Sequence, residues 1–399
     1  MVYRMTEWIE CTLDKLGEIV GGATPSTKCE DYYGGSIPWI TPKDLSSFKG
    51  RYITSGERNI TEKGLASCSA QMMPKDAVLF TSRAPIGYVA IASQSVCTNQ
   101  GFKSIVVNEK ADPLFVYYLL KYNKDAIEAM GSGTTFKEVS GKTMRAVKVR
   151  IPLDVSYQKR IAAVLDSLDT KIENNERIND NLEQQAQAYF QELFVDNADP
   201  EWTTGTISDL GTVVGGSTPS KAKPEYYTES GIAWITPKDL SINKSKFVSH
   251  GENDITELGL RNSSASLMPE GTVLFSSRAP IGYIAIAAGE VTTNQGFKSV
   301  VPKPEIGTPF VYFFLKNTLP VIEGMASGST FKEVSGSTMK NVPAVIPDAE
   351  TLAKFSDFCA PIFAQQRILE EQNQSLATLR DNLLPKLMSG EIDVSSVHL

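Results

Sequence analysis

The chain of 399 residues contains one long sequence twice, at an offset of 194 to 195 residues. Four motifs return in the same order: WITPKDL at 39–45 and 234–240, SRAPIGY at 82–88 and 277–283, TNQGFKS at 98–104 and 293–299, and TFKEVSG at 135–141 and 330–336. Between 76–106 and 271–301, 22 of 31 aligned positions are identical. This period exceeds the about 20 to 50 residues of solenoid repeats, so each copy is predicted to be a domain with its own core.

The duplication also limits which residues can carry a shared function. A chemistry common to both copies must use side chains that both copies contain. The five cysteines and the two histidines fail that condition, because each faces a different residue or none in the other copy. The cysteines form no CxxC pair, and a zinc site needs about four clustered ligands. We therefore expect no metal, no disulfide and no cofactor.

Local patterns within each copy predict a mixed α+β domain. The runs 77–80 and 88–92 are rich in β-branched and aromatic residues, and the Pro and Gly between them indicate a turn joining two strands. The segment 114–130 and its counterpart 309–325 have apolar residues at helical spacing. The fold class is therefore α+β, with two similar globular domains.

After each domain the apolar residues alternate in steps of four and three, as in the seam of a coiled coil. The predicted helix-pair and partner interface comprises Ile161, Leu165, Leu168, Ile172 and Leu182 in the first segment, and Ile362, Leu369, Leu376, Leu379 and Leu383 in the second. Polar residues interrupt both seams, Asn175 and Asn179 in one and Gln365 and Gln372 in the other. The alternative is two amphipathic helices that each pack on their own domain.

These patterns give four segments: a globular domain at 1–152, a spacer helix at 153–200, a second globular domain at 201–347 and a second helix at 348–399. We expect the helices to pair as an antiparallel coiled coil and the domains to be related by a pseudo-two-fold axis. At 1.5 Å per residue a helix of about 38 residues is roughly 57 Å long, more than the about 34 Å of one DNA turn.

Composition excludes several classes of protein. With 41% hydrophobic and 21% charged residues the chain is expected to fold. No stretch reaches the roughly 18 apolar residues of a membrane span, and the first residues lack a signal-peptide core, so a cytoplasmic protein is expected. The net charge of -7 argues against wrapping DNA with the whole surface. Basic residues must act locally if DNA is the ligand.

The motifs LFTSRAPIGYVAI, TNQGFKSI and GTTFKEVSG, recurring between long heptad helices, and the C-terminal LRDNLLPKLMSGEI at 379–392, resemble type I restriction-modification specificity subunits. The resemblance implies that the globular domains are target recognition domains on double-stranded DNA. It implies helices that dock two methyltransferase subunits acting on adenine, with motor-nuclease subunits joining for cleavage. Recognition domains in such subunits usually differ strongly from each other, whereas these are near copies. A split, near-palindromic target is therefore expected.

Basic and amide side chains in the repeated loops are the candidates for DNA contact. They are Arg83 and Arg278 in the SRAPIG turns, Lys43 and Lys238 after WITP, Lys137 and Lys332 in TFKEVSG, and Asn99 and Asn294 in TNQG. The alternatives are arginines that bond nearby carbonyls, solvated lysines, and asparagines that only hold their own turns; the last is the commoner role of such a sequence.

Segments that differ between the copies bear on specificity. SSFKGRYITS at 46–55 faces SINKSKFVSH at 241–250, and both are basic and polar. Lys49, Arg51, Lys244 and Lys246 are further candidates for DNA contact there. Surface drift is the simpler explanation of the difference.

No catalytic machinery is visible. The sequence has no NPPY- or DPPY-like methyltransferase tetrapeptide, no GxxxxGK[ST] phosphate loop and no duplicated His or Cys nucleophile. A non-catalytic DNA-recognition subunit is the favoured function. One rival is a duplicated protein-binding scaffold without DNA specificity, which the acidic charge favours. A second rival is a hydrolase using Asp44 with Glu57 and Asp239 with Glu252, pairs that lack any motif context.

Overall fold

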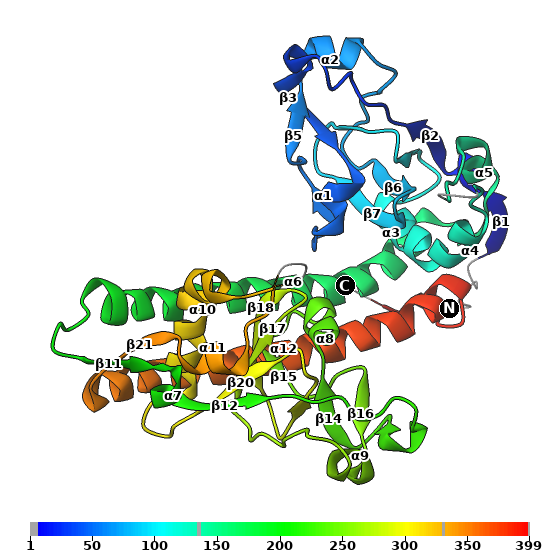
Figure 1. The fold of residues 1–399 in the computed structure, drawn as a ribbon. Coiled ribbons are helices and arrows are strands. Elements are labelled where there is room, and N and C mark those ends of the chain that lie inside the picture. The colour runs from blue at the N-terminus through cyan, green and yellow to red at the C-terminus, as the bar shows by residue number, and fades with distance from the viewer. Residues whose placement is uncertain (1–6, 134–136, 329–331, 398–399) are drawn as a thin grey trace. The chain divides into compact units, whose positions relative to one another are not determined.

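The computed structural model describes residues 7–133, 137–328 and 332–397, and the chain divides into two units (Figure 1). Unit 1 comprises Met1–Asn174 and Asn373–Leu399, and unit 2 comprises Asn175–Gln372. Each unit therefore contains one copy of the repeat together with part of both long helices.

Unit 1 contains three sheets. Its strands are β1 (Trp8–Thr12), β2 (Gly17–Gly21), β3 (Tyr33–Ile40), β4 (Tyr52–Ile53), β5 (Arg58–Ile60), β6 (Val78–Ser82), β7 (Ile86–Ala92), β8 (Cys97–Thr98), β9 (Lys103–Val107) and β10 (Lys148–Pro152). A five-stranded sheet has the order β2-β9-β6-β7-β4, a three-stranded sheet has the order β5-β3-β8, and β1 pairs with β10. Its short helices are α1 (Pro42–Ser46), α2 (Glu62–Ala66), α3 (Pro113–Tyr122), α4 (Lys124–Ala129) and α5 (Gly141–Ala146).

Unit 2 repeats this topology. Its strands are β11 (Thr203–Thr206), β12 (Gly211–Gly215), β13 (Tyr227–Thr228), β14 (Ile232–Ile235), β15 (Phe247–Val248), β16 (Asn253–Ile255), β17 (Val273–Ser277), β18 (Ile281–Ala287), β19 (Thr292–Thr293), β20 (Lys298–Pro302) and β21 (Pro343–Ile346). The sheet orders are β12-β20-β17-β18-β15, β13-β16-β14-β19 and β11-β21. Its short helices are α7 (Ile207–Leu210), α8 (Pro237–Ile242), α9 (Glu257–Arg261), α10 (Thr308–Met325) and α11 (Gly336–Lys340).

The central strand of each five-stranded sheet is buried on both faces. In β6 the side chains of Val78 and Phe80 join the core beneath α3, whereas Leu79 joins a second core beneath the three-stranded sheet. β17 divides its side chains between two cores in the same way. A strand covered on both faces needs a continuous apolar run rather than alternation, which explains the sequences VLF at 78–80 and 273–275.

The predicted helix at 114–130 is two helices in unit 1, because α3 ends at Tyr122 and α4 begins at Lys124. Asn123 lies between them and donates its side-chain amide to the Leu119 carbonyl. In unit 2 the counterpart α10 continues to Met325 despite Pro320 within it. The helical prediction was therefore right in position, and it missed the interruption at Asn123.

The two long helices are α6 (Val155–Gln191) and α12 (Ala349–Ser389). An aspartate caps each start: the Asp154 carboxylate accepts from the Ser156 N–H, and the Asp348 carboxylate from the Thr351 N–H. Gly390, at a φ of 78°, follows the end of α12 in the left-handed conformation that favours glycine. The expected α+β class, with two similar domains and two long helices, is confirmed.

Within each unit the two helices run antiparallel. In unit 1 Arg380 binds Asp169, and the Asn373 amide donates to the Ile172 carbonyl. In unit 2 the Gln366 amide donates to the Asn179 carbonyl, and Tyr189 lies against Phe355. Increasing residue numbers on α6 thus meet decreasing numbers on α12.

Candidate nucleic-acid interface

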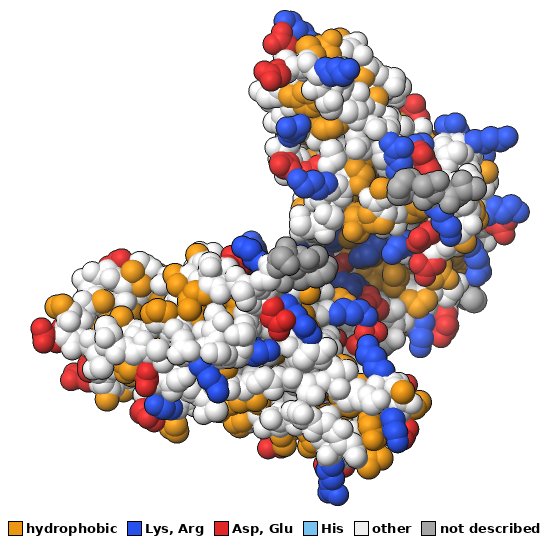
Figure 2. Space-filling model, in the orientation of Figure 1, with side chains coloured by type: hydrophobic (Ala, Val, Ile, Leu, Met, Phe, Trp, Pro, Cys, Tyr) orange, Lys and Arg blue, Asp and Glu red, His pale blue; other side chains and the backbone are white. Residues whose placement is uncertain are grey.

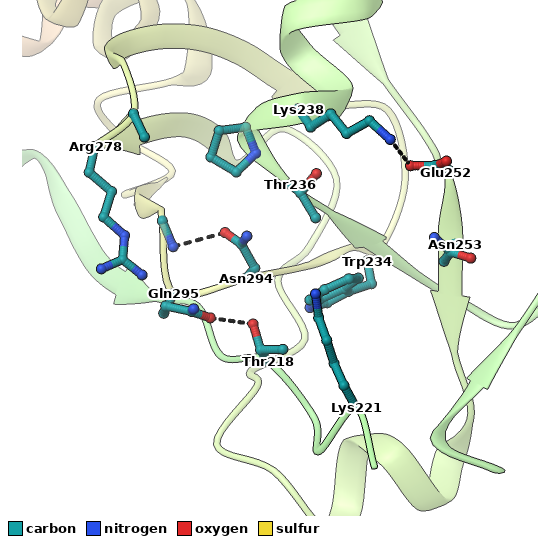
Figure 3. Close-up of a pocket in the computed structure, with 13 residues that line it drawn as sticks. Thr218, Lys221, Trp234, Thr236, Lys238, Glu252, Asn253, Arg278, Asn294 and Gln295 are labelled. Carbon is teal, nitrogen blue, oxygen red and sulfur yellow. Dashed lines mark hydrogen bonds and ion pairs between the residues drawn. The ribbon is translucent and has the colours of Figure 1, made fainter. Parts of the chain in front are cut away.

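In unit 2 the repeated motifs converge on one surface hollow of about 500 Å³ (Figure 3). Its lining residues come from five separate parts of the copy and are Thr218, Lys221, Trp234, Thr236, Pro237, Lys238, Glu252, Asn253, Arg278, Ala279, Asn294, Gln295 and Gly296. WITPK, SRAP and TNQG, which are far apart in the sequence, supply nine of these thirteen residues.

A short helix start fixes the WITPKDL motif. The Thr236 N–H and hydroxyl both donate to the Asp239 carboxylate, which gives the capping box that begins α8. Pro237 stands at the first helical position, where no N–H is needed. Thr41, Pro42 and Asp44 build the same start for α1 in unit 1.

Asn99 and Asn294 hold the TNQG turns. The side-chain oxygen of Asn99 accepts from the Gly101 N–H, and that of Asn294 accepts from the Gly296 N–H, both at 2.8 Å. The turn-holding role considered from the sequence is therefore present in both copies. A DNA contact by these two residues remains a prediction.

A glycine makes room for this turn in each unit. A Cβ on Gly216 would lie 2.0 Å from the Asn294 carbonyl oxygen, and one on Gly22 would lie 2.1 Å from the Thr98 carbonyl oxygen. No side chain fits there. The segment after β12 can therefore reach the TNQG turn, where the Thr218 hydroxyl bonds the Gln295 side chain.

Arg83 and Arg278 stand on tight turns between two strands, as expected. The following residues, Ala84 and Ala279, have φ values of 52° and 53°. Arg83 pairs with Glu138 at 3.5 Å and Arg278 with Glu333 at 3.3 Å, and both arginines remain about one third exposed. A structural partner and an accessible guanidinium are thus both present.

A second hollow of about 600 Å³ adjoins the first at Arg278 and includes Lys332. Lys332 and its counterpart Lys137 are exposed. Lys298 also binds Glu333, and burial lowers the pKa of its ammonium. Arg278 therefore lies between two hollows that cationic side chains line.

Lys43 and Lys238 are exposed and bind the carboxylates of Glu57 and Glu252, at 2.7 and 2.5 Å. Glu57 and Glu252 are the glutamates that the alternative hydrolase hypothesis would use together with Asp44 and Asp239. The partners Asp44 and Asp239 are bonded within their capping boxes, so each carboxylate has a structural partner. On the face drawn in Figure 2, Lys and Arg side chains are dispersed over each unit, with acidic side chains beside many of them.

The expectation that Arg51 contacts DNA is wrong for this structure, because its side chain is buried. Only 6% of Arg51 is exposed, and its guanidinium lies among Asp166, Asp169 and Glu173 of α6, with Nε 3.1 Å from the Asp166 carboxylate. Burial lowers the pKa of Arg51, but these carboxylates outweigh it and the net pKa is raised. Arg51 therefore anchors its loop to the helix.

The same correction applies to Lys246, which is the counterpart of Arg51 and 7% exposed. Its ammonium lies 2.7 Å from the Glu183 carboxylate and 2.9 Å from the Gln366 side-chain oxygen. The ring of Phe363 lies 3.5 Å away. Burial lowers the pKa of Lys246 to about 8. The other two candidates for DNA contact in these loops, Lys49 and Lys244, are exposed.

Most residues of the predicted helix seam are at least partly buried, and their pairing as a coiled coil stays a prediction. Ile161, Leu165, Ile362 and Leu369 are buried; Leu168, Ile172, Leu182, Leu376 and Leu383 are partly buried. Leu379 is 47% exposed, so its place in the seam is wrong. Gln365 and Gln372 are exposed too, although the Gln372 side-chain oxygen accepts from the Asn175 amide of α6. The residues one position later, Gln366, Asn373 and Arg380, also bond α6. Around Gln366 and Arg380 the steps of four and three along α12 thus occur in the opposite order to that predicted.

Sequence reasoning missed several residues on the wall of the hollow, among them Lys221 and Asn253. The counterparts of these two are Thr27 and Arg58, so these positions differ between the copies. The signal available was cross-strand pairing: Arg58 faces Trp39 and Asn253 faces Trp234 in the same register. That pairing becomes visible only when the strands are known.

Two absences hold for the described part of the chain. No group of three or more His, Cys, Asp or Glu side chains there is arranged to hold a metal ion. No described helix is long and apolar enough to cross a membrane.

Comparisons with known proteins agree with the duplicated architecture. The family model of the type I restriction modification DNA specificity domain matches residues 5–184 and again 200–379. The MjaIX type I restriction enzyme specificity subunit of Methanocaldococcus jannaschii is 32% identical, with 98% of this chain and 95% of that protein covered. The HindI specificity subunit of Haemophilus influenzae is 24% identical, with 73% and 80% covered. A solved type I restriction-modification S subunit from M. genitalium has a TM-score of 0.62 at 18% identity, with 97% of each chain covered.

Proposed function

The chain belongs to the type I restriction modification DNA specificity family, and from this premise we propose that it is the sequence-reading subunit of a type I restriction-modification complex. One observation carries the proposal. Each copy brings the same motifs together with the same hydrogen bonds, and in unit 2 they line a hollow with Arg, Lys, Asn and Gln side chains. These are the side chains that contact phosphates and base edges.

The duplication gives the form of the target. Two near-identical domains related by a pseudo-two-fold axis would meet the two strands in opposite directions, so like loops would contact like bases. The target is then a half-site, a fixed spacer and an inverted half-site, nearly palindromic, with the helix pair setting the spacer. We also propose that the recognition domains are residues 1–152 and 201–347 and that the spacer helices are residues 153–200 and 348–399.

The partners follow from the exposed faces of the long helices. Ile178 of α6, and Ile368 and Leu379 of α12, are large apolar residues that are more than 45% exposed. The helices in this proposal bury these side chains against other proteins, which would remove their apolar surface from water. We assign these faces to two methyltransferase subunits that modify adenine in each half-site, with motor-nuclease subunits joining for cleavage.

The chain itself acts without catalysis and without a cofactor in this proposal, in the cytoplasm. The protein-scaffold alternative would explain the exposed helix faces. It would not explain why amide and guanidinium side chains gather around the same turns in both copies. Family membership also favours the DNA-reading role.

The test is reconstitution with a type I methyltransferase subunit from the same organism. We expect adenine methylation of DNA to require both proteins, and the purified chain alone to turn over no S-adenosylmethionine. A double variant, Arg83→Ala with Arg278→Ala, should fold and still join the methyltransferase but bind the target at least about tenfold more weakly, since a bidentate base contact contributes about 1 to 3 kcal/mol. Methylation that persists without this chain would overturn the proposal.

A further inference from the structure

The positions that line the hollow of about 500 Å³ in unit 2 are mostly occupied by the same residue types in unit 1. Of the thirteen residues that line the hollow of unit 2, eleven have the same residue type at the equivalent position of unit 1. The two exceptions are Lys221, which is Thr27 in unit 1, and Asn253, which is Arg58. Among the positions that line this hollow, only these two pairs can therefore make the two units differ in what they bind.

Arg58 and Asn253 occupy the same place in the fold. Each begins the strand beside the motif tryptophan, and each is the direct cross-strand partner of that tryptophan. Both side chains are exposed. In Figure 3 Asn253 lies on the opposite side of the hollow from Arg278, with Trp234 and Asn294 between them.

The Arg58 guanidinium is held in place. It lies 5.6 Å from the centroid of the Tyr33 ring, and that ring meets Trp39 edge-on at 6.0 Å. The attraction between a cation and an aromatic face favours this position of the guanidinium over others. In unit 2 the equivalent rings, Tyr227 and Trp234, keep their edge-on contact at 5.7 Å.

The shared floor of the hollow presents hydrogen-bond donors. The side-chain oxygens of Asn294 and Gln295 are already bonded, to the Gly296 N–H and the Thr218 hydroxyl, so their amide nitrogens are left for a ligand. The carboxylate of Glu252 is taken by Lys238. Such a floor suits an acceptor that both half-sites possess, such as a phosphate. It cannot distinguish one half-site from the other.

We propose that Arg58 and Asn253 set one base at which the two half-sites differ, guanine for Arg58 and adenine for Asn253. The proposal rests on the DNA-reading function given above. Arginine has donors only and matches the O6 and N7 acceptors of guanine, whereas asparagine has a donor and an acceptor that match N7 and the N6 amino group of adenine.

The experiment uses the chain assembled with its methyltransferase subunits and a set of duplexes carrying the wild-type target with each base pair varied in turn. For Arg58→Asn we expect binding to the wild-type duplex to fall about 10- to 100-fold, and to recover when one guanine in a single half-site becomes adenine. Asn253→Arg should change the opposite half-site from adenine to guanine. The control Lys148→Asn removes an equally exposed cation on β10, outside the hollow, and should leave the preference unchanged.

The outcomes are distinguishable. An Arg58→Asn complex that binds all duplexes more weakly by the same factor, with a shallower dependence on salt, shows a phosphate contact and overturns the proposal. An unchanged preference in both variants also overturns it. If the wild-type complex prefers no duplex at all, the proposed function itself has failed. Because the two substitutions lie in different units, misfolding of one variant still leaves the other as a test.

Discussion

Arg51 and Lys246 occupy equivalent positions in the two copies, and both fasten a loop of the globular domain to a long helix in their unit. Arginine meets three carboxylates in unit 1, whereas lysine meets one carboxylate, an amide and aromatic rings in unit 2. A buried cation without partners is costly, so each anchor is matched to its own helix segment. Sequence alone could not separate these two from exposed basic residues, because burial depends on what packs above the loop.

Removing the Arg51 anchor should destabilise unit 1. Arg51→Ala removes the cation that lies 3.1 Å from the Asp166 carboxylate and 3.3 Å from that of Glu173. We expect a loss of about 3 kcal/mol in the free energy of unfolding. Urea denaturation measures this loss. The control Lys28→Ala, at an exposed site, should change it by less than about 0.5 kcal/mol. If Arg51→Ala left the stability unchanged and altered the DNA target, Arg51 would contact DNA rather than anchor its loop.

Glu183 should make the stability of unit 2 depend on acid pH. Burial raises the pKa of this carboxyl, but Lys246 and Lys316 outweigh burial and lower it to about 2. The folded pKa is below the ordinary value of 4.5, so Glu183 contributes stability above pH 4.5, and this stability is lost as the pH falls from 4.5 to about 2. Relative to Glu183→Gln, the wild-type chain should lose about 3 kcal/mol over that range. Parallel stability curves for the two proteins, measured by urea denaturation, would contradict this.

The seam positions of α12 are spaced three or four residues apart, and the order of these spacings decides which polar side chains lie between the long helices. Gln366 is 3% exposed, and its amide group bonds both the Asn179 carbonyl and Lys246, whereas its neighbour Gln365 faces solvent. The apolar pattern predicted the seam at Ile362 and Leu369, which are both buried. It placed Gln365 rather than Gln366 between them, because a step of three or of four satisfies the heptad equally well.

A matched pair of variants tests this register. Gln366→Leu leaves buried polar partners unsatisfied and should lower the stability of unit 2 by about 1 to 3 kcal/mol. Gln365→Leu, one position earlier, should change it by less than about 0.5 kcal/mol. Thermal or urea unfolding of both proteins gives the comparison. Equal losses would show that the two glutamines are equally buried in solution and that the seam is misplaced.

At the scale of the whole molecule, the duplication was the most informative feature of the sequence. It predicted two domains of one fold and the exclusion of cysteine and histidine chemistry, and the matching sheet orders confirm that the two copies share one fold. It could not show that WITPK, SRAP and TNQG meet around one hollow, since that depends on parallel pairing of β14 with β19 and on the turn after β17. The wall positions Arg58 and Asn253 were missed for the same reason.

The central claim is that two near copies read two half-sites of one split target. Sequencing of methylated adenines in cells that contain this chain and its methyltransferase partner tests that claim most directly. We expect a single methylated motif that consists of a half-site, a spacer of fixed length and an inverted half-site of nearly the same sequence. Each half-site should contain one methylated adenine. Two half-sites of unrelated sequence, or a single undivided motif, would contradict the claim.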